Sequence, residues 1–386
     1  MQRLPLTERP DWRLQAEEVG FRFHTIDGEP YWDESACYRF TLEQIERDIE
    51  DAAQQLMGMC YDTVAHVLAH DDLLRRLRIP ESYWDYLRES WRRGDRDLYG
   101  RFDLAYDGEG PAKLLEFNAD TPTGLFEAAV FQWLWLEDAR RDGRVPERAD
   151  QFNAIHEALV AGFGGLDLPA GWLHFASIRD HEEDRGTVAY LEDCAQQAGL
   201  LTRFVHIEDI GVDAEGRLTD LDDQIVTSLF KLYPWEWLLA EEAGRHLLRG
   251  HTRIIEPPWK MVLSNKGLLP ILWEGYGGHP LLLPSWFEGD PAAEALGGRY
   301  VRKPLLGREG ANVEIVDGGT AAFEPGPYGA EGYVVQALQP LPEFSGQHPV
   351  LGAWVVAGRA CGLGIREDRS PITTNRSRFL PHIILD

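Results

Sequence analysis

Positive charge is the scarcest feature of this 386-residue sequence. Lysine and arginine together number 38, against 64 aspartate and glutamate residues, and the formal net charge is −26 at pH 7. Because nucleic-acid phosphates attract proteins through a positive surface, this balance argues against a general nucleic-acid-binding function. A strongly negative field instead concentrates cations such as polyamines near the protein, although acidic residues also serve solubility alone.

Cysteine and long apolar runs are also scarce. The cysteines are Cys37, Cys60, Cys194 and Cys361, and no two of them form a CxxC pair. Such usage is typical of reduced thiols in a cytoplasmic protein, not of a disulfide framework or a zinc site. No apolar run reaches membrane length, and residues 1–10 lack the apolar core of a signal peptide. The sequence therefore predicts a cytoplasmic protein without a membrane partner, long enough for two or three packed units.

Polar residues at alternating positions mark two neighbouring strands. Arg101 and Asp103 lie two residues apart, as do Glu116 and Asn118, so each pair projects from one face of an extended chain. The glycines and proline of residues 107–111 predict a turn that joins the two runs as an antiparallel hairpin. One face would then carry a cation, two carboxylates and an amide, unless it is only a solvated polar surface. The opposite face would enter the core through Phe102, Leu104, Leu115 and Phe117.

The oxygen-bearing side chains of this face suit a hard cation. Asp103, Glu116 and Asn118 could hold Mg²⁺ and leave positions open for phosphate oxygens or water. A helical run begins a few residues later, with a threonine as its candidate N-cap and a proline in its first turn. Free N–H groups at that helix start could bind a substrate carboxylate beside Thr121 and Thr123, and an ordinary capped helix is the open alternative.

Periodic patterns predict further helices and strands along the chain. Residues 1–40 are aromatic and irregular, and Thr41 with Gln44 forms a capping box that opens a long amphipathic helix. Beyond the hairpin, strand and helix alternate, which indicates a small α/β unit with a parallel component. The expected helices cover residues 41–70, 81–93, 125–135 and 185–198, and the expected strands cover residues 172–178 and 201–207. Residues 224–233 are expected to form another buried strand or the start of a helix.

An acidic cluster follows the first strand of this α/β unit. Asp180, Glu182 and Glu183 lie just after that strand, at its carboxyl end, where ligands of open α/β sheets commonly bind. These carboxylates could bind a substrate ammonium group. A solvated acidic loop is the alternative.

The last third of the chain contains residues suited to phosphate. Lys303 precedes a loop with Gly307 and Gly310, which would let backbone amides approach nucleotide phosphates. The loop lacks the GK[ST] ending and the following helix of a Walker A motif. Alone it could be a plain hairpin turn, but Lys266 upstream supplies a second cation and favours a nucleotide site.

The remaining strands complete the nucleotide-binding pattern. A proline-broken strand over residues 332–342 is a natural hinge, and it would place Gln336 and Leu338 near the adenine. Residues 350–366 have the pattern of a β-hairpin with a tight Ala357-Gly358 turn. The segment from about residue 366 to 378 is suited to close as a lid that excludes water.

These motifs together resemble a known family. The sequence Arg101-Phe-Asp, followed by Leu-Leu-Glu-Phe-Asn-Ala-Asp-Thr-Pro-Thr and by the Lys266 and Lys303 segments, resembles the synthetase domain of the glutathionylspermidine synthase family. That family has a permuted ATP-grasp fold and joins a carboxylate to a polyamine amine through an acyl phosphate. The resemblance extends over nearly the whole chain.

The resemblance also implies roles for individual residues. The three oxygen ligands would bind Mg²⁺, Arg101 and Arg366 would contact the transferring phosphoryl group, and Arg376 would be the basic residue of the loop that follows. The acidic residues at 180–183 correspond to a region where the family places polyamine ligands. Where bifunctional members have Ser-x-Ser-Cys, this chain has a Thr-Pro-Thr-Gly sequence ending at Gly124, so the acid is expected to differ from glutathione.

The sequence therefore predicts an α/β (α+β) protein with an ATP-grasp-like fold. Residues 1–170 would form an N-terminal segment with a long helix and the metal-binding hairpin, 171–258 a small α/β unit, and 259–386 the nucleotide-binding region. The predicted activity is ATP- and Mg²⁺-dependent ligation of a small-molecule carboxylate to a polyamine-like amine, with no amidase domain fused. A peptide or amino-acid ligase of the same chemistry and a catalytically silent nucleotide- or polyamine-binding relative remain alternatives.

Overall fold

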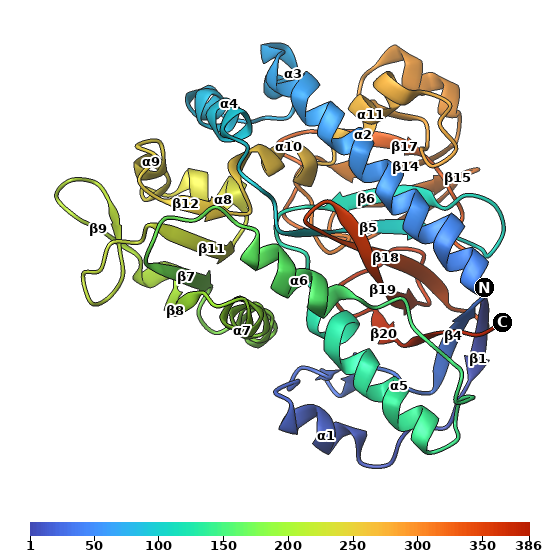
Figure 1. Ribbon diagram of the computed structural model, residues 1–386. Coiled ribbons are helices and arrows are strands. Elements are labelled where there is room, and N and C mark those ends of the chain that lie inside the picture. The colour runs from blue at the N-terminus through green and yellow to red at the C-terminus, as the bar shows by residue number, and fades with distance from the viewer.

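Strands from two distant parts of the chain form one central sheet. A computed structural model describes residues 1–386, with Thr320 described by its backbone alone (Figure 1). The central sheet has the order β20-β19-β18-β5-β6, and every neighbouring pair is antiparallel. Its strands are β5 (Tyr99–Ala105), β6 (Lys113–Asn118), β18 (His348–Val356), β19 (Arg359–Asp368) and β20 (Arg378–Leu380). The mixed α/β class predicted from the sequence is confirmed.

Strands β5 and β6 form the predicted hairpin. Arg101 pairs with Asn118 and Asp103 with Glu116, so the four polar residues share one face. A register shift after Asp103 pairs Leu104 with Leu114. The prediction that Leu115 enters the core is therefore wrong, because a β-bulge turns it toward the polar side and Leu114 takes the buried position.

Helices cover the central sheet. The predicted capping box is confirmed, since Thr41 N–H donates to Gln44 Oε1 at 3.0 Å and Gln44 N–H donates to Thr41 Oγ1 at 3.2 Å. The long helix that follows crosses the sheet in Figure 1 and begins with a π-helical stretch. Elements on this side are η1 (Gln44–Glu50), α2 (Asp51–Leu68), α3 (Asp71–Arg76), η2 (Glu81–Tyr83) and α4 (Trp84–Arg93).

The opposite side carries the helix predicted after the hairpin. The helical backbone starts after Gly124, and no threonine side chain caps it, so the predicted threonine cap is wrong. Residues distant in the sequence bind these threonines instead. The Thr123 backbone carbonyl accepts a hydrogen bond from Arg101, and the Thr121 side-chain Oγ1 accepts one from Arg308. The helices of this side are η3 (Glu127–Phe131), α5 (Gln132–Arg141) and α6 (Ile155–Gly164).

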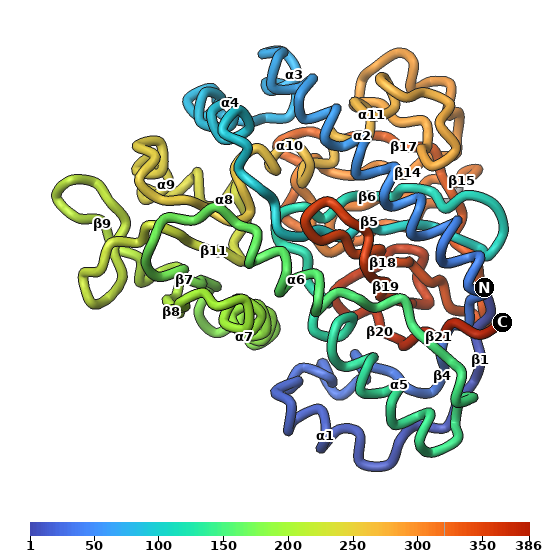
Figure 2. Tube along the Cα trace, viewed as in Figure 1, coloured from blue at the N-terminus to red at the C-terminus, as the bar shows by residue number. Residues whose placement is uncertain are grey.

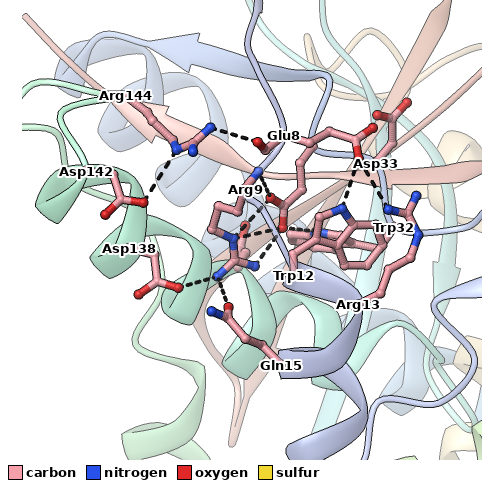
Figure 3. A network of polar contacts seen from close by, with 12 residues as sticks. Glu8, Arg9, Trp12, Arg13, Gln15, Trp32, Asp33, Asp138, Asp142 and Arg144 are labelled. Carbon is pink, nitrogen blue, oxygen red and sulfur yellow. Dashed lines mark hydrogen bonds and ion pairs between the residues drawn. The ribbon is translucent and has the colours of Figure 1, made fainter.

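The N-terminal segment wraps around this side and is fixed by a buried arginine. Arg9 forms ion pairs with Glu34 at 2.6 Å and with Asp138 of α5 at 2.8 Å (Figure 3). Both termini come together in a small sheet of order β1-β4-β21, and they lie side by side in Figure 2. Elements here are β1 (Gln2–Pro5), α1 (Trp12–Glu18), β2 (Thr25–Ile26), β3 (Glu29–Pro30), β4 (Ala36–Phe40) and β21 (His382–Ile384).

A four-stranded sheet lies in the stretch where the sequence predicts a small α/β unit. Its strands are parallel and have the order β12-β11-β7-β8. In Figure 1 it projects to one side of the central sheet. It contains β7 (Trp172–Ser177), α7 (Glu182–Gln197), β8 (Leu201–His206), η4 (Ile207–Asp209), β9 (Gly211–Val212), β10 (Leu218–Thr219), β11 (Ser228–Leu232), α8 (Trp235–Ala240), α9 (Gly244–Leu247) and β12 (Arg253–Ile255).

A second antiparallel sheet, of order β13-β17-β14-β15-β16, carries the predicted glycine loop between β14 and β15. Its strands are β13 (Ser285–Phe287), β14 (Arg299–Pro304), β15 (Glu314–Asp317), β16 (Thr320–Phe323) and β17 (Tyr333–Ala337). The preceding helices are η5 (Pro258–Lys260), α10 (Met261–Ser264) and α11 (Leu268–Tyr276), with η6 (Pro291–Leu296) after β13. None of the helices in the described chain is both long and apolar enough to cross a membrane.

Candidate active site

A cavity of about 580 Å³ lies where the central sheet, the α/β unit and the glycine loop meet. Most of the predicted site residues line it, although they come from distant parts of the chain. The predicted residues found there are Arg101, Asp103, Glu116, Asn118, Thr121, Thr123, Glu183, Lys266, Lys303, Gly307, Gly310, Leu338 and Arg366.

Two arginines converge on one carboxylate at the base of the cavity. Asp103 accepts hydrogen bonds from Arg101 Nε at 2.6 Å and from Arg366 Nη2 at 3.0 Å. The Arg101 guanidinium also lies over the Trp354 ring, 5.6 Å from its centre. Because Asp103 holds both arginines and the indole also holds Arg101, their remaining N–H groups are preorganised for an anion such as a phosphoryl group.

The three predicted metal ligands lie together beside these arginines. Asn118 Nδ2 is 3.2 Å from Asp103 Oδ2 and 3.4 Å from Glu116 Oε1. If the Asn118 amide were flipped, its oxygen would occupy the position assigned here to Nδ2. Two carboxylates and an amide oxygen fit Mg²⁺, which takes its other ligands from phosphates and water. In the part of the chain that the structure describes, no three His, Cys, Asp or Glu residues gather as a metal site, so the metal would depend on this mixed set.

Two lysines from the last third of the chain lie near Glu116. Lys266 Nζ is 2.9 Å from Glu116 Oε2, and Lys303 Nζ donates to the Leu115 carbonyl and to Gln336 Oε1, both at 2.8 Å. Burial disfavours ionised Glu116, but Lys266 and then Lys303 outweigh it and hold the pKa of that carboxyl well below its usual range. The pKa of Lys303 is lowered to about 8, mainly by burial and also by Lys266, while Glu116 opposes the decrease.

The glycine loop brings a further arginine to the cavity. Arg308 donates to Thr121 Oγ1 and to Glu236 Oε1, each at 2.7 Å, so it links the loop to the hairpin end and to α8. Gly310 has φ +74°, and a Cβ at that position would lie 2.6 Å from the Thr373 carbonyl. Only glycine therefore allows the loop to approach the segment after β19.

Acidic groups also line the cavity. Glu183 and Asp184 lie in the first turn of α7, and Glu309 comes from the glycine loop. His181 caps α7 by accepting the Asp184 N–H at 3.2 Å, and its hydrogen bond to the Asp184 side chain raises the pKa of its imidazole. The cavity is therefore lined by cations suited to phosphate and by carboxylates suited to an ammonium group.

Comparison with known proteins decides the relationship. Residues 3–385 match the family model described as glutathionylspermidine synthase preATP-grasp. The chain belongs to this family. This membership confirms the predicted family and the predicted class of enzyme, an acid–amine ligase.

Several relatives resemble the chain in sequence. A Haemophilus influenzae protein described as "Putative acid--amine ligase" is 43% identical over 388 residues, which cover 97% of both chains. The trypanothione synthetase of Crithidia fasciculata is 30% identical over 351 residues, 84% of this chain and 53% of that protein. The bifunctional glutathionylspermidine synthetase/amidase of Escherichia coli is 27% identical over 399 residues, 96% of this chain and 62% of that protein. The chain thus spans only part of the length of these last two relatives.

A solved structure shares the fold. The apo form of a glutathione synthetase-like effector from Globodera pallida has a TM-score of 0.52 over 98% of both chains, at 13% sequence identity. This likeness concerns the fold alone.

Four residues predicted for the site of this family member lie outside the cavity. Asp180 and Glu182 are exposed, because α7 begins at Glu182 and only the next residues of its first turn face inward. Arg376 is exposed and pairs with Asp27 at 2.8 Å. Gln336 is buried in β17, and its Oε1 accepts a hydrogen bond from Lys303. The structure therefore does not place Gln336 at the expected adenine edge.

The sequence did not identify several titratable residues that line the cavity, among them Arg308, Glu309, Asp184 and His181. Arg308 and Glu309 lie between the two glycines of the predicted loop. Charged residues inside a candidate phosphate-binding loop are a sequence signal that could have identified both. Asp184 directly follows the predicted acidic cluster, and His181 lies inside it. Which of these side chains face the cavity depends on the start of α7, which is at Glu182 and not at the predicted residue 185.

Proposed function

We propose that this chain forms an amide bond between a carboxylic acid and a polyamine-like amine, using MgATP and an acyl-phosphate intermediate on an ATP-grasp-like fold. The observation that carries the proposal is that one cavity is lined by both kinds of charge. Five cationic side chains and three candidate oxygen ligands line it, and so do the carboxylates of Glu183, Asp184 and Glu309. We assign the first group to a cationic end and these carboxylates to an acidic end. A phosphate-handling site and an ammonium-handling site within one cavity suit the two halves of such a ligation.

The cationic end would handle phosphoryl transfer. Asp103, Glu116 and Asn118 would hold Mg²⁺, which when bound would neutralise phosphate charge. Arg101 and Arg366 would stabilise the charge that develops as the γ-phosphoryl group moves to the acid. This supply of positive charge matters because the protein as a whole is strongly negative.

The acid would lie beside the start of the helix after Gly124. Backbone N–H groups there, with Thr121, Thr123 and Arg308, would orient the carboxylate for in-line attack. Gly124 has φ +78°, and a Cβ there would lie 3.2 Å from the Phe379 ring. A cysteine at this position would be strained and crowded, which supports an acid other than glutathione.

The amine would enter at the acidic end. Glu183, Asp184 and Glu309 would bind one or more ammonium groups, which favours a diamine or polyamine over a neutral nucleophile. An amino-acid or peptide amine is the second candidate. Its carboxylate would be repelled by this end of the cavity, so the charge distribution favours the polyamine-like amine.

ADP release from a matrix of acids and amines tests the proposal. We expect release to require Mg²⁺, an acid and an amine together, with polyamines preferred, and mass spectrometry to identify the amide. MgATP should also raise the melting temperature, because a ligand bound only by the folded state stabilises it. Stabilisation by MgATP without ADP release from any pair would favour the catalytically silent alternative, and no stabilisation would exclude a nucleotide site.

A further inference from the structure

An exposed tryptophan lines the same cavity. Trp237 of α8 is 41% exposed, and among the large exposed apolar side chains of the described chain it alone lines the cavity. Apolar surface gains free energy when it is removed from water, and an indole offers a large area for this gain. A tryptophan that is exposed inside a cavity is therefore a candidate contact for a ligand.

Neighbouring groups hold the Trp237 ring in place. Tyr233 lies against it edge to face, with 5.6 Å between the ring centres and 70° between the planes, and the Tyr233 hydroxyl donates a hydrogen bond to Glu241. The start of α8 is also fixed, because Asp120 accepts the Trp235 N–H at 2.8 Å. Trp237 is therefore a preorganised apolar wall, which a ligand does not have to order when it binds.

The indole lies beside the groups proposed to bind the acid. The Arg308 guanidinium carbon is over the Trp237 ring, 5.9 Å from its centre. Arg308 in turn donates to Thr121 Oγ1 and to Glu236 Oε1, each at 2.7 Å. A carboxylate bound by Thr121 and Arg308 would therefore leave the rest of its molecule within reach of the indole. A substrate ammonium group is disfavoured at this ring, because the guanidinium already lies over it and repels a second cation.

Further apolar residues line the cavity from the same edge of the α/β unit. Ile178 directly follows β7, and Leu232 ends β11, the parallel neighbour of β7 in which Leu232 pairs with Ser177. Pro234 and Trp237 come directly after β11. The cavity-lining apolar residues thus come from adjacent segments. The acid-binding side combines a few hydrogen-bonding groups with an apolar wall, as pockets for small molecules commonly do.

We propose that Trp237 is a specificity-determining residue, and that it selects a carboxylic acid with an apolar group, such as a hydrocarbon ring, beyond the carboxylate. This inference rests on the proposed ligase function and adds the chemical class of the acid. The apolar group covers the indole while Thr121 and Arg308 hold the carboxylate. An acid with amide or charged groups at that position binds less well, because those groups lose water and find no hydrogen-bond partner on the ring.

A pair of small acids tests the selection. 3-Phenylpropionate and succinamate share a propionate arm, and they end in a phenyl ring and a carboxamide, respectively. In ligand-observed NMR titrations of the wild-type protein, we expect 3-phenylpropionate to bind about tenfold more tightly than succinamate. Trp237→Ala should remove this preference. Trp237→Phe should keep most of it, because an aromatic surface remains.

Trp172→Ala is the matched control for Trp237→Ala. Trp172 belongs to the same α/β unit, is also 41% exposed and has the Arg203 guanidinium over its ring, but it does not line the cavity. Its removal should leave the preference between the two acids as in the wild type.

Kinetics with spermidine as the amine separate the two substrates. Trp237→Ala should raise KM for 3-phenylpropionate about tenfold and leave KM for spermidine and for ATP nearly unchanged. Three results would overturn the inference while the ligase function stands: no preference in the wild type, an unchanged preference in folded Trp237→Ala, or a rise in KM for spermidine in place of the acid. Preferential binding of 3-phenylpropionate without ADP release from any acid–amine pair would instead overturn the ligase function on which the inference rests.

Discussion

Lys266 and Glu116 form an ion pair of 2.9 Å that joins the segment after α10 to strand β6. Lys266 also donates to the Gly307 carbonyl at 2.6 Å, so one ammonium group connects a proposed metal ligand to the glycine loop. The pair therefore couples the metal end of the cavity to the element proposed to hold the nucleotide phosphates. Removal of either charge should therefore affect both the proposed metal site and the proposed nucleotide site.

Glu116→Gln tests the proposed metal ligand. It removes a charged oxygen ligand but keeps the size of the side chain, so ADP release should fall on the order of 100-fold and need a higher Mg²⁺ concentration. The measurement is ADP release across a Mg²⁺ titration. Glu109→Gln, in the exposed turn of the same hairpin, is the matched control and should behave as the wild type. A wild-type Mg²⁺ dependence in folded Glu116→Gln would make the hairpin structural.

Lys303 should give ATP binding a pH dependence. Burial first lowers the pKa of its ammonium to about 8, and only the protonated form attracts phosphate. KM for ATP should therefore rise as the pH increases from 7 to about 9. Lys303→Met should remove this dependence and weaken binding by about 1.5–3 kcal/mol. Lys113→Met, on β6 but outside the cavity, is the control. If Lys303→Met kept the pH dependence of the wild type, the effect would belong to another group.

The same depressed pKa has a consequence for stability. Between pH 8 and 10.5 the unfolded chain binds more proton at Lys303 than the folded protein does, so the free energy of unfolding should rise with pH across this window. Lys303→Met should lack that increase. Urea denaturation at several pH values measures it.

The hairpin and the capping box could be predicted because their signals are local. Alternation of Arg101 and Asp103 and the glycine-rich turn set the strand faces, and Thr41 and Gln44 bond each other three residues apart. The bulge that moves Leu115 was not visible, because it depends on how β6 packs against its neighbours. The pairing of β5 with β18 joins segments about 250 residues apart, and no local pattern encodes it.

The acidic cluster shows which feature of the site could not be predicted from the sequence, namely which carboxylate faces the cavity. Successive residues of a helix point about 100° apart, so a small error in the helix start changes which carboxylate faces a ligand. The sequence favoured Asp180 and Glu182 equally with Glu183, and only Glu183 lines the cavity. The predicted threonine cap is absent, and the Thr121 side-chain oxygen accepts a hydrogen bond from the distant Arg308 instead.

Glu183→Gln and the adjacent Glu182→Gln form a matched pair that tests the amine site. Loss of the cavity carboxylate should raise KM for the amine about tenfold or more and leave KM for ATP nearly unchanged. Loss of the exposed Glu182 carboxylate should have little effect beyond a salt-sensitive change of less than about twofold. Steady-state kinetics at low and moderate salt separate these effects. Equal kinetics in the two variants would show that this end of the cavity does not bind the amine.

Gly310→Ala tests the close approach of the glycine loop to the segment after β19. Its new Cβ would meet the Thr373 carbonyl at 2.6 Å, whereas Gly318 in the β15–β16 turn has positive φ with open space around it. Both alanine variants should lose roughly 1 kcal/mol of stability through backbone strain. Only Gly310→Ala should also raise KM for ATP several-fold, because only there must the loop move. Similar KM values in the two variants would contradict this packing role.

The ion pair of Asp120 and Lys231 joins the end of the β5–β6 hairpin to the α/β unit. Its atoms are 2.7 Å apart, both side chains are almost wholly buried, and Asp120 Oδ2 also accepts the Trp235 N–H at 2.8 Å. Asp120→Asn keeps an acceptor for Trp235 but leaves Lys231 unpaired, so it should lower the free energy of unfolding by about 3 kcal/mol. Lys231→Met leaves Asp120 unpaired and should cost a similar amount. The double variant should lose at least about 1 kcal/mol less than the sum, because neither charge is then stranded. Urea denaturation of the four proteins measures the coupling, and strict additivity would mean that the two charges do not stabilise each other.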